Sequence, residues 1–286
     1  AGSTKTITAK LVLNDIGAGG ATSQQNLALS LDSARYADSN GAVSTDATDR
    51  DGSEIRAYNS IPTVSVVDLT NSTLVNGQSA DVYKFTVTAD SNGPVALKQI
   101  KLPITWTDGV DADTLEMESW KLYKNGTDVS TSSSAVVIQD ESGNDVEDTT
   151  GVVEASTTVV VIWDTNEDVI AGGETVTYTL RATPTGFDSD SDTGDEDYFS
   201  IYLAGDTAHN STDICLEDTG AGDIWELDGQ VSSACTSAST DNSAYNFIWS
   251  DSSGESHDGA TETGSGDWSV GYLIKNLDLS GETWAK

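Results

Sequence analysis

The 286-residue chain contains little methionine and histidine and no long apolar runs. These scarcities limit the kinds of fold and function that it can have. It contains one Met and two His, and no apolar stretch approaches the ~20 residues that a helix needs to cross a bilayer. Helical periodicity is also almost absent, with the short segment 111–120 as the nearest candidate. These absences argue against a helical membrane span and against a helical fold.

Basic residues are scarce as well. The chain has 13 Lys and Arg against 47 Asp and Glu, which gives a formal net charge of −34. Such a chain repels the phosphates of nucleic acids and of anionic membranes. The acidic excess fits a soluble exposed surface, divalent-cation binding or a salty habitat. Because only 21% of residues are charged and the acids gather in loops, cation sites or solvated loop tips are favoured over a uniformly charged surface.

Catalytic signatures are missing. His209 and His257 each lie in a polar stretch without a Cys or His partner at metal-ligand spacing. Ser256, His257 and Asp258 are adjacent in sequence, whereas the members of a catalytic triad converge from separate elements. The chain shows no phosphate-binding loop, dinucleotide fingerprint or nucleophile elbow. We therefore expect a protein that is not an enzyme.

The chain does contain a long run of strand signals. Val, Ile, Thr and aromatic residues alternate with polar ones, and Gly, Asn or Asp turns separate the segments. Strands are expected at 61–69, 81–89, 95–106, 119–126, 135–140, 157–164, 175–183 and 198–206. In the second of these, Tyr83, Phe85 and Val87 form the expected core face. The pattern predicts an all-β protein, an antiparallel Ig-like or Greek-key sandwich with loop-rich insertions.

The first fifteen residues have the pattern of an isolated strand. The apolar positions Ile7, Ala9, Leu11 and Leu13 recur with a period of two, which is typical of a strand with one apolar face. No partner strand follows at hairpin distance, because the next residues are rich in glycine and small side chains. The strand therefore pairs at a distance, either within its own sandwich or as a strand exchanged into a neighbouring subunit.

Changes in composition divide the chain into four parts. We expect a donor strand at 1–15, a loop-rich connection at 16–60 and the sandwich core at 61–206. The remainder, 207–286, is expected to be a disulfide-stapled loop followed by closing strands near 245–251 and 267–277.

The cysteines and the opening residues indicate export. In an oxidising compartment a disulfide between Cys215 and Cys235 is favoured over two buried thiols. It would close a loop of about 20 residues and contribute roughly 3 kcal/mol. The opening AGST is typical of residues after a signal cleavage site, so we expect a secreted protein of the cell surface. Asn71, Asn125 and Asn210 begin N-x-S/T sequons and are candidate glycan attachment sites.

Two acidic clusters are candidate calcium sites. The first cluster comprises Asp46, Asp49, Asp51 and Glu54. The second comprises Asp188, Asp190, Asp192, Asp195, Glu196 and Asp197. Hard cations take several oxygen ligands from flexible loops, and closely spaced acids repel one another without a cation. Neither spacing is that of an EF-hand, so a solvated acidic loop is the alternative at both clusters.

Several segments resemble a known kind of protein. They are VNGQSADVYKFTVTADSNGPVALKQIKLPITW, SWKLYKNGTDV, VVVIWDTNEDVIAGGETVTYTLRAT, NFIWSDSSGESH and DWSVGYLIKNL. Together they resemble predicted surface proteins of candidate-phyla-radiation bacteria, in which a FIWSD motif precedes a W-x-x-GYL motif. The resemblance covers about residues 63–204 and 245–284. It implies a secreted β-sandwich protein of the cell surface and brings no catalytic residues.

Together these features predict a structural subunit of an extracellular, pilus-like filament. The chain would bind copies of itself head to tail, with the 4–14 strand inserted into the next subunit. The alternative is a cell-surface adhesin, a carbohydrate-binding protein or a surface-layer protein, with Trp225, Trp249 or Trp268 as exposed platforms. A secreted hydrolase is the third and least supported hypothesis.

Overall fold

The computed structural model describes most of the chain. It covers residues 6, 8–10, 12, 16 and 26–286, except for 54, 110–113, 131–135, 148–151, 154–157, 189–195, 208–212, 219–224, 231–244, 255–256 and 258–266. These residues form the strands β1 to β22 and one short 3₁₀ turn, η1 (Gly271–Leu273). None of the described elements is a helix long and apolar enough to cross a membrane. The all-β prediction is confirmed.

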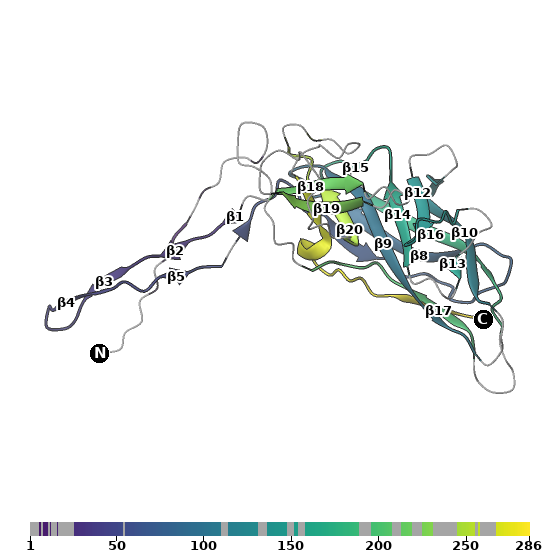
Figure 1. Ribbon diagram of the computed structural model, residues 1–286, viewed down its shortest axis with the longest axis horizontal. Coiled ribbons are helices and arrows are strands. Elements are labelled where there is room, and N and C mark those ends of the chain that lie inside the picture. The colour runs from purple at the N-terminus through teal and green to yellow at the C-terminus, as the bar shows by residue number, and fades with distance from the viewer. Residues whose placement is uncertain are drawn as a thin grey trace.

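Two antiparallel sheets pack face to face as a sandwich (Figure 1). The first sheet has the order β11-β10-β16-β8-β7, with β13 beside β10. Its strands are β7 (Thr63–Val66), β8 (Ala80–Thr88), β10 (Glu116–Lys124), β11 (Thr127–Asp128), β13 (Val152–Val153) and β16 (Thr175–Thr185). Most neighbours in this sheet are distant in the chain, because the chain crosses repeatedly between the two sheets.

The second sheet is built around its longest strand, β9 (Val95–Thr107). Its path is β12-β14-β9-β17-β22, while β15 and β20 also pair with β9, and β21 pairs with β20. The other strands are β12 (Val136–Asp140), β14 (Thr158–Trp163), β15 (Asp168–Ile170), β17 (Tyr198–Ile201), β20 (Phe247–Ser250), β21 (Trp268–Val270) and β22 (Glu282–Ala285). The closing strands predicted near the end of the chain thus complete the sandwich itself.

Apolar side chains from the two inner faces fill the space between the sheets. Tyr83, Phe85 and Val87 of β8 are fully buried there, as the alternation predicted. The rings of Phe85 and Tyr178 stack with their centroids 5.2 Å apart. Every residue of β14 is buried, which is why that strand reads as a continuous apolar run rather than an alternating one.

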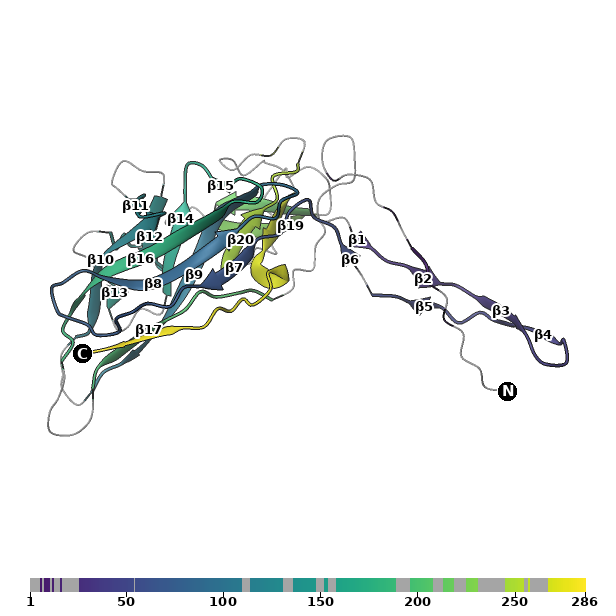
Figure 2. The ribbon, with the colours of Figure 1, turned by 180° about the vertical axis from the view of Figure 1, so that it is seen from behind.

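Residues 26–56 form a two-stranded ribbon that projects away from the sandwich, and we name it the arm (Figure 2). Its strand pairs are β1 (Asn26–Leu27) with β6 (Ile55–Arg56), β2 (Ser30–Leu31) with β5 (Arg50–Asp51), and β3 (Ala34–Ala37) with β4 (Val43–Asp46). At the tip, Asp38 Oδ1 accepts hydrogen bonds from the backbone N–H groups of Asn40 and Ala42. Much of the stretch expected as a loop-rich connection, 16–60, is therefore a paired ribbon. The pairs are only two to four residues long, too short for an alternation signal.

The segment 267–277, expected as one strand, is a strand only over β21 and then turns into η1. A Cβ atom added at Gly271 would lie 2.9 Å from Asp206 Oδ2 and 3.0 Å from Phe247 Cβ, so only glycine fits where the chain turns. Before this segment, β18 (Asp213–Asp218) and β19 (Trp225–Gln230) form a separate antiparallel hairpin, and β18 lies near β21.

The burial of β16 gives a direct test of the core. Leu180→Ala is expected to lower the free energy of unfolding by ~2–5 kcal/mol, because Leu180 is fully buried between the sheets. The matched control Val169→Ala removes a side chain that is 50% exposed, and surface changes of this kind usually cost within about 0.5 kcal/mol. Urea unfolding followed by tryptophan fluorescence measures both. Equal losses would contradict the placement of β16.

Candidate functional site

One side of the arm is apolar and largely unburied. The exposed fractions are 63% for Leu29, 49% for Leu31, 54% for Val43 and 65% for Ile55. Leu27, Leu29 and Leu31 alternate along the segment that runs from β1 to β2, and the register places Ile55 beside Leu27. Residues paired across strands share a face, so Ile55 lies on the same side of the ribbon as Leu27, Leu29 and Leu31, and we call this the apolar side. Arg50 stands opposite Leu31 there, and Val43 lies nearer the tip, opposite Ala37. A lone two-stranded ribbon is marginal in water, which makes this side a candidate contact surface.

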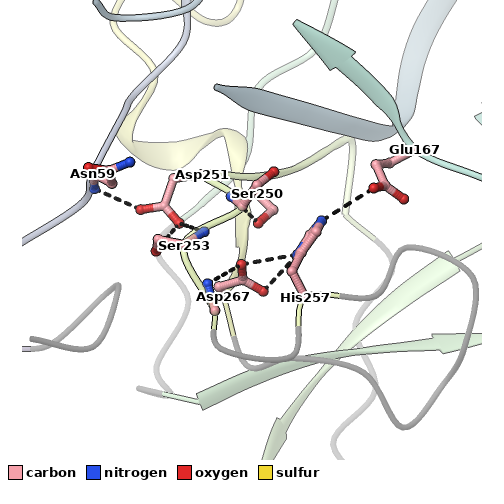
Figure 3. Close-up of polar contacts among 9 residues, drawn as sticks. Asn59, Glu167, Ser250, Asp251, Ser253, His257 and Asp267 are labelled. Carbon is pink, nitrogen blue, oxygen red and sulfur yellow. Dashed lines mark hydrogen bonds and ion pairs between the residues drawn. The ribbon is translucent and has the colours of Figure 1, made fainter. Parts of the chain in front are cut away.

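The root of the arm, residues 57–60, is fixed to the sandwich. The Tyr58 ring packs against Trp249 of β20 with a centroid separation of 5.3 Å, and its hydroxyl lies 3.2 Å from Ser269 Oγ. The backbone N–H of Asn59 donates to Asp251 Oδ2 at 2.7 Å, as Figure 3 shows. The arm therefore leaves the sandwich from a buried, hydrogen-bonded base.

A polar cluster lies next to this root (Figure 3). Asp267 accepts a hydrogen bond from the Gly254 backbone N–H at 3.0 Å and lies 3.0 Å from His257 Nδ1. On the other side of the ring, His257 Nε2 is 3.5 Å from Glu167 Oε1. The imidazole also packs on Trp268, with centroids 5.2 Å apart. These contacts join the turn after β14, the loop after β20 and the start of β21.

The charge state of this cluster follows from its carboxylates. Burial alone would lower the pKa of His257, but Asp267 and Glu167 outweigh it and raise that pKa to about 9. Hydrogen bonding to His257, which outweighs burial, lowers the pKa of Glu167. A protonated imidazole has no lone pair for general-base chemistry. The geometry is that of an ion-pair cluster in which His257 links Glu167 and Asp267, and we call it the His257 tie.

The FIWSD and W-x-x-GYL motifs supply much of this structure. Phe247 and Trp249 are fully buried in β20. Asp206 accepts hydrogen bonds from the backbone N–H groups of Asn246 (2.6 Å), Phe247 (3.0 Å) and Gly271 (2.8 Å), and burial raises its pKa despite these bonds. Asp206 thus holds the two motifs together.

The hypothesis of exposed tryptophan platforms is corrected by the same geometry. Trp249 and Trp268 are fully buried, because Trp249 packs under the arm root and Trp268 lies beneath the His257 ring. The side chain of Trp225, on β19, lies outside the described part of the chain. No described residue of this trio offers a stacking surface to a carbohydrate.

The first predicted calcium cluster lies on the arm and contains a basic residue. Arg50 Nη2 is 2.7 Å from Asp46 Oδ2. Hydrogen bonds, above all the one from Arg50, lower the pKa of Asp46 to about 2. Asp46 ends β4 and Asp51 ends β5, with Asp49 between the two strands, whereas Glu54 lies outside the described residues. A guanidinium group already neutralises part of this cluster.

The second predicted calcium cluster is only partly described. The carboxylate of Asp197 is buried and accepts hydrogen bonds from the backbone N–H groups of Gly109 and Asp188. Asp190, Asp192 and Asp195 lie outside the described residues. Within the described ranges, no group of three or more His, Cys, Asp or Glu side chains is placed to hold a metal ion. Calcium binding stays a prediction.

The candidate donor strand also falls largely outside the described residues, including Ile7, Leu11 and Leu13. Ala9 is described and exposed, and Val12 is 92% exposed. The described positions of this segment therefore pack on neither sheet.

Of the remaining predicted sites, some lie within the described residues and some lie outside them. The backbone of Cys215 lies in β18, but its side chain and all of Cys235 are outside the described part, so their disulfide stays a prediction. Asn71 and Asn125 are exposed, which leaves both sequons accessible. Asn210 lies outside the described residues.

Sequence reasoning missed the arm and its root. The one available signal was Asn40-Gly41 between ARYA and VSTD, since Asn-Gly between two short strand-like runs is a strong hairpin signal. Nothing in the sequence pointed to His257 as a buried group, because it sits in a polar stretch far from Glu167.

Comparisons with known proteins find only weak structural likenesses. No protein-family profile matches the chain, and no curated protein matches it. Among solved structures, one described as AvmM, which catalyses macrocyclization in alchivemycin A biosynthesis, is 11% identical with a TM-score of 0.20, over 54% of this chain and 79% of that one. The D312A variant of BcpA, the major pilin subunit of Bacillus cereus, is 10% identical with a TM-score of 0.22, over 87% and 76%. BcpA itself is 8% identical with a TM-score of 0.19, over the same shares. Likeness this weak carries no argument about function.

The His257 tie predicts a pH dependence of stability. Its folded pKa of about 9 lies above the ordinary value of about 6.5, so the tie stabilises the fold fully below about pH 6.5 and is lost as pH rises through 9. Between these values the free energy of unfolding should fall in the wild type. In His257→Gln this part of the decline should disappear. Urea unfolding at several pH values tests this, and identical slopes in both proteins would contradict it.

Proposed function

We propose that this chain is the structural subunit of an extracellular, pilus-like filament on the cell surface. Subunits join head to tail, with the strand at 4–14 donated to the next copy. The observation that carries the proposal is the arm, whose apolar side is exposed while its root is buried in the sandwich. A contact between two different surfaces does not close on itself, so it propagates as a fibre.

The arm has the energetic character of a contact element. Fully burying a Leu, Ile or Val side chain contributes roughly 1.5–3 kcal/mol, and those of Leu29, Leu31, Val43 and Ile55 are still about half to two-thirds exposed. Covering them on a neighbouring subunit supports both the ribbon and the association. The fixed root supports this role, because an anchored arm loses less orientational freedom on binding than a free tail does.

The proposal is tested by charging the apolar side of the arm. The wild type is expected to form regular fibres in negative-stain electron microscopy. The variant Leu29→Glu with Leu31→Glu should form none, because burying two unpaired carboxylates at the contact is unfavourable.

The matched control is Val169→Glu, the same kind of change at an exposed apolar residue of β15. It should leave the fibres intact, and all three proteins should unfold at similar urea concentrations. Fibres that persist in the arm variant would remove the arm from the contact. A wild type that stays monomeric under every condition would reject the filament.

We also propose that calcium binds the acidic loop at 188–197. The support is the density of acids in this loop and the preference of calcium for several loop oxygens. Calcium at 100 times its dissociation constant should raise the free energy of unfolding by about 2.7 kcal/mol. Asp190→Asn with Asp192→Asn should abolish that increase, whereas Asp46→Asn, on the arm, should not. An unfolding midpoint that does not respond to calcium or to EGTA would exclude the site.

A further inference from the structure

Most outer edges of the two sheets are covered by other parts of the chain. Along β12, the Ile138 N–H donates to Glu147 Oε1 and the Ile138 C=O accepts from the Val146 N–H. Along β22, Leu74 N donates to Ala285 O and Ala285 N donates to Ser72 O. The outer side of β10 carries β11 and β13. Covered edges of this kind prevent unwanted strand pairing.

Strand β7 is different, because no described strand pairs with its outer side. Its register with β8 runs from Thr63 opposite Thr88 to Val66 opposite Phe85. Just beyond, the Val67 N–H donates to Lys84 O at 2.8 Å. Hydrogen-bonded and non-hydrogen-bonded pairs alternate in an antiparallel ladder. Thr63 and Ser65 therefore bond to β8, and the peptide groups of Val64 and Val66 point outward.

The end of this edge is negatively charged. Asp68 lies two residues beyond the end of β7. Glu282 of β22 lies close enough that burial, together with the Asp68 carboxylate, raises the pKa of Glu282. Within the described residues, no ion pair joins either carboxylate to a basic side chain. A cation brought to this end would relieve the repulsion between the two acids.

The start of the chain has the complementary chemistry. Lys5 and Lys10 are the only charged residues among positions 1–14, in a chain of formal net charge −34. From residue 6 to residue 13 the positions Ile7, Ala9, Leu11 and Leu13 alternate with Thr6, Thr8, Lys10 and Val12, as a strand over a half-buried edge requires, and Lys5 lies at the end of the apolar row. In its own subunit the described part of this segment, including Val12, stays exposed, so it does not occupy its own β7.

We propose that residues 4–14 of a second copy of this chain add to the outer edge of β7 as an antiparallel strand. This inference rests on the proposed filament and names its acceptor site. Facing pairs share a side of the sheet, so Ile7 opposite Val66 and Ala9 opposite Val64 continue the buried face of β7. The same register places Lys5 opposite Asp68 and Thr8 opposite Ser65.

The register provides a cross-linking test in the full chain. In this register Thr8 and Ser65 would form a non-hydrogen-bonded pair on the solvent side, where the Cα separation of about 4.5 Å suits a disulfide. Under mild oxidation, Thr8→Cys with Ser65→Cys should give a ladder of dimers, trimers and longer species on a non-reducing gel. Reductant should collapse the ladder to the monomer. The single variants Thr8→Cys and Ser65→Cys, and the off-register pair Thr8→Cys with Thr63→Cys, are the controls and should give little ladder.

The possible outcomes distinguish a failure of the proposed β7 acceptor site from a failure of the proposed filament. Fibres by electron microscopy together with the expected ladder support both. Fibres of the double-cysteine variant without a ladder overturn the β7 edge and leave the filament standing. If the double-cysteine variant gives neither fibres nor a ladder and the wild type is also monomeric, the proposed function is rejected. A cross-link confined to the monomer means that the strand closes its own sheet, which overturns the proposal.

Discussion

The structure depends on the backbone of β9 being paired along both edges. Strands β14 and β15 cover one edge, and β17 and β20 cover the other. Peptide groups removed from water must find hydrogen-bond partners, so a buried strand of this length recruits segments from distant parts of the chain. One of them, β20, carries Trp249, and Asp251 follows it directly. The same pairing that completes the core therefore also places the residues that hold the arm root.

The excess of aspartate has a structural explanation in the loops. Asp197, Asp206 and Asp267 are buried or mostly buried, and each accepts hydrogen bonds from backbone N–H groups of distant segments. Asp251 does the same for the arm root. A hydrogen bond to a charged group contributes about 1.5–3 kcal/mol, so carboxylates can replace sheet pairing where the chain is irregular. At these positions the carboxylates fix the backbone of irregular segments.

The sequence predicted those parts of the fold whose signal is local. Tyr83, Phe85 and Val87 alternate within one strand, so their burial could be read directly. The arm could not, because its pairing joins residues such as Asn26 and Arg56 through short segments without sustained alternation. The cluster around His257 was equally hidden. It depends on Glu167 and Asp267 meeting through the tertiary fold, and no spacing along the chain encodes that meeting.

Charge bears on the form of the proposed polymer. One donated strand and one open edge give each subunit two contacts with its neighbours, and two contacts per subunit generate a line, whereas a layer needs at least one more. The arm is the element able to provide a third contact.

A lateral contact would bring long rows of subunits together, and each subunit has a formal net charge of −34. At physiological ionic strength, exposed charges more than about 8 Å apart are largely screened, but the acids of two surfaces in contact lie closer than this and still repel. An arm lying along the next subunit of the same row avoids most of that repulsion. The charge therefore favours a filament over a surface layer.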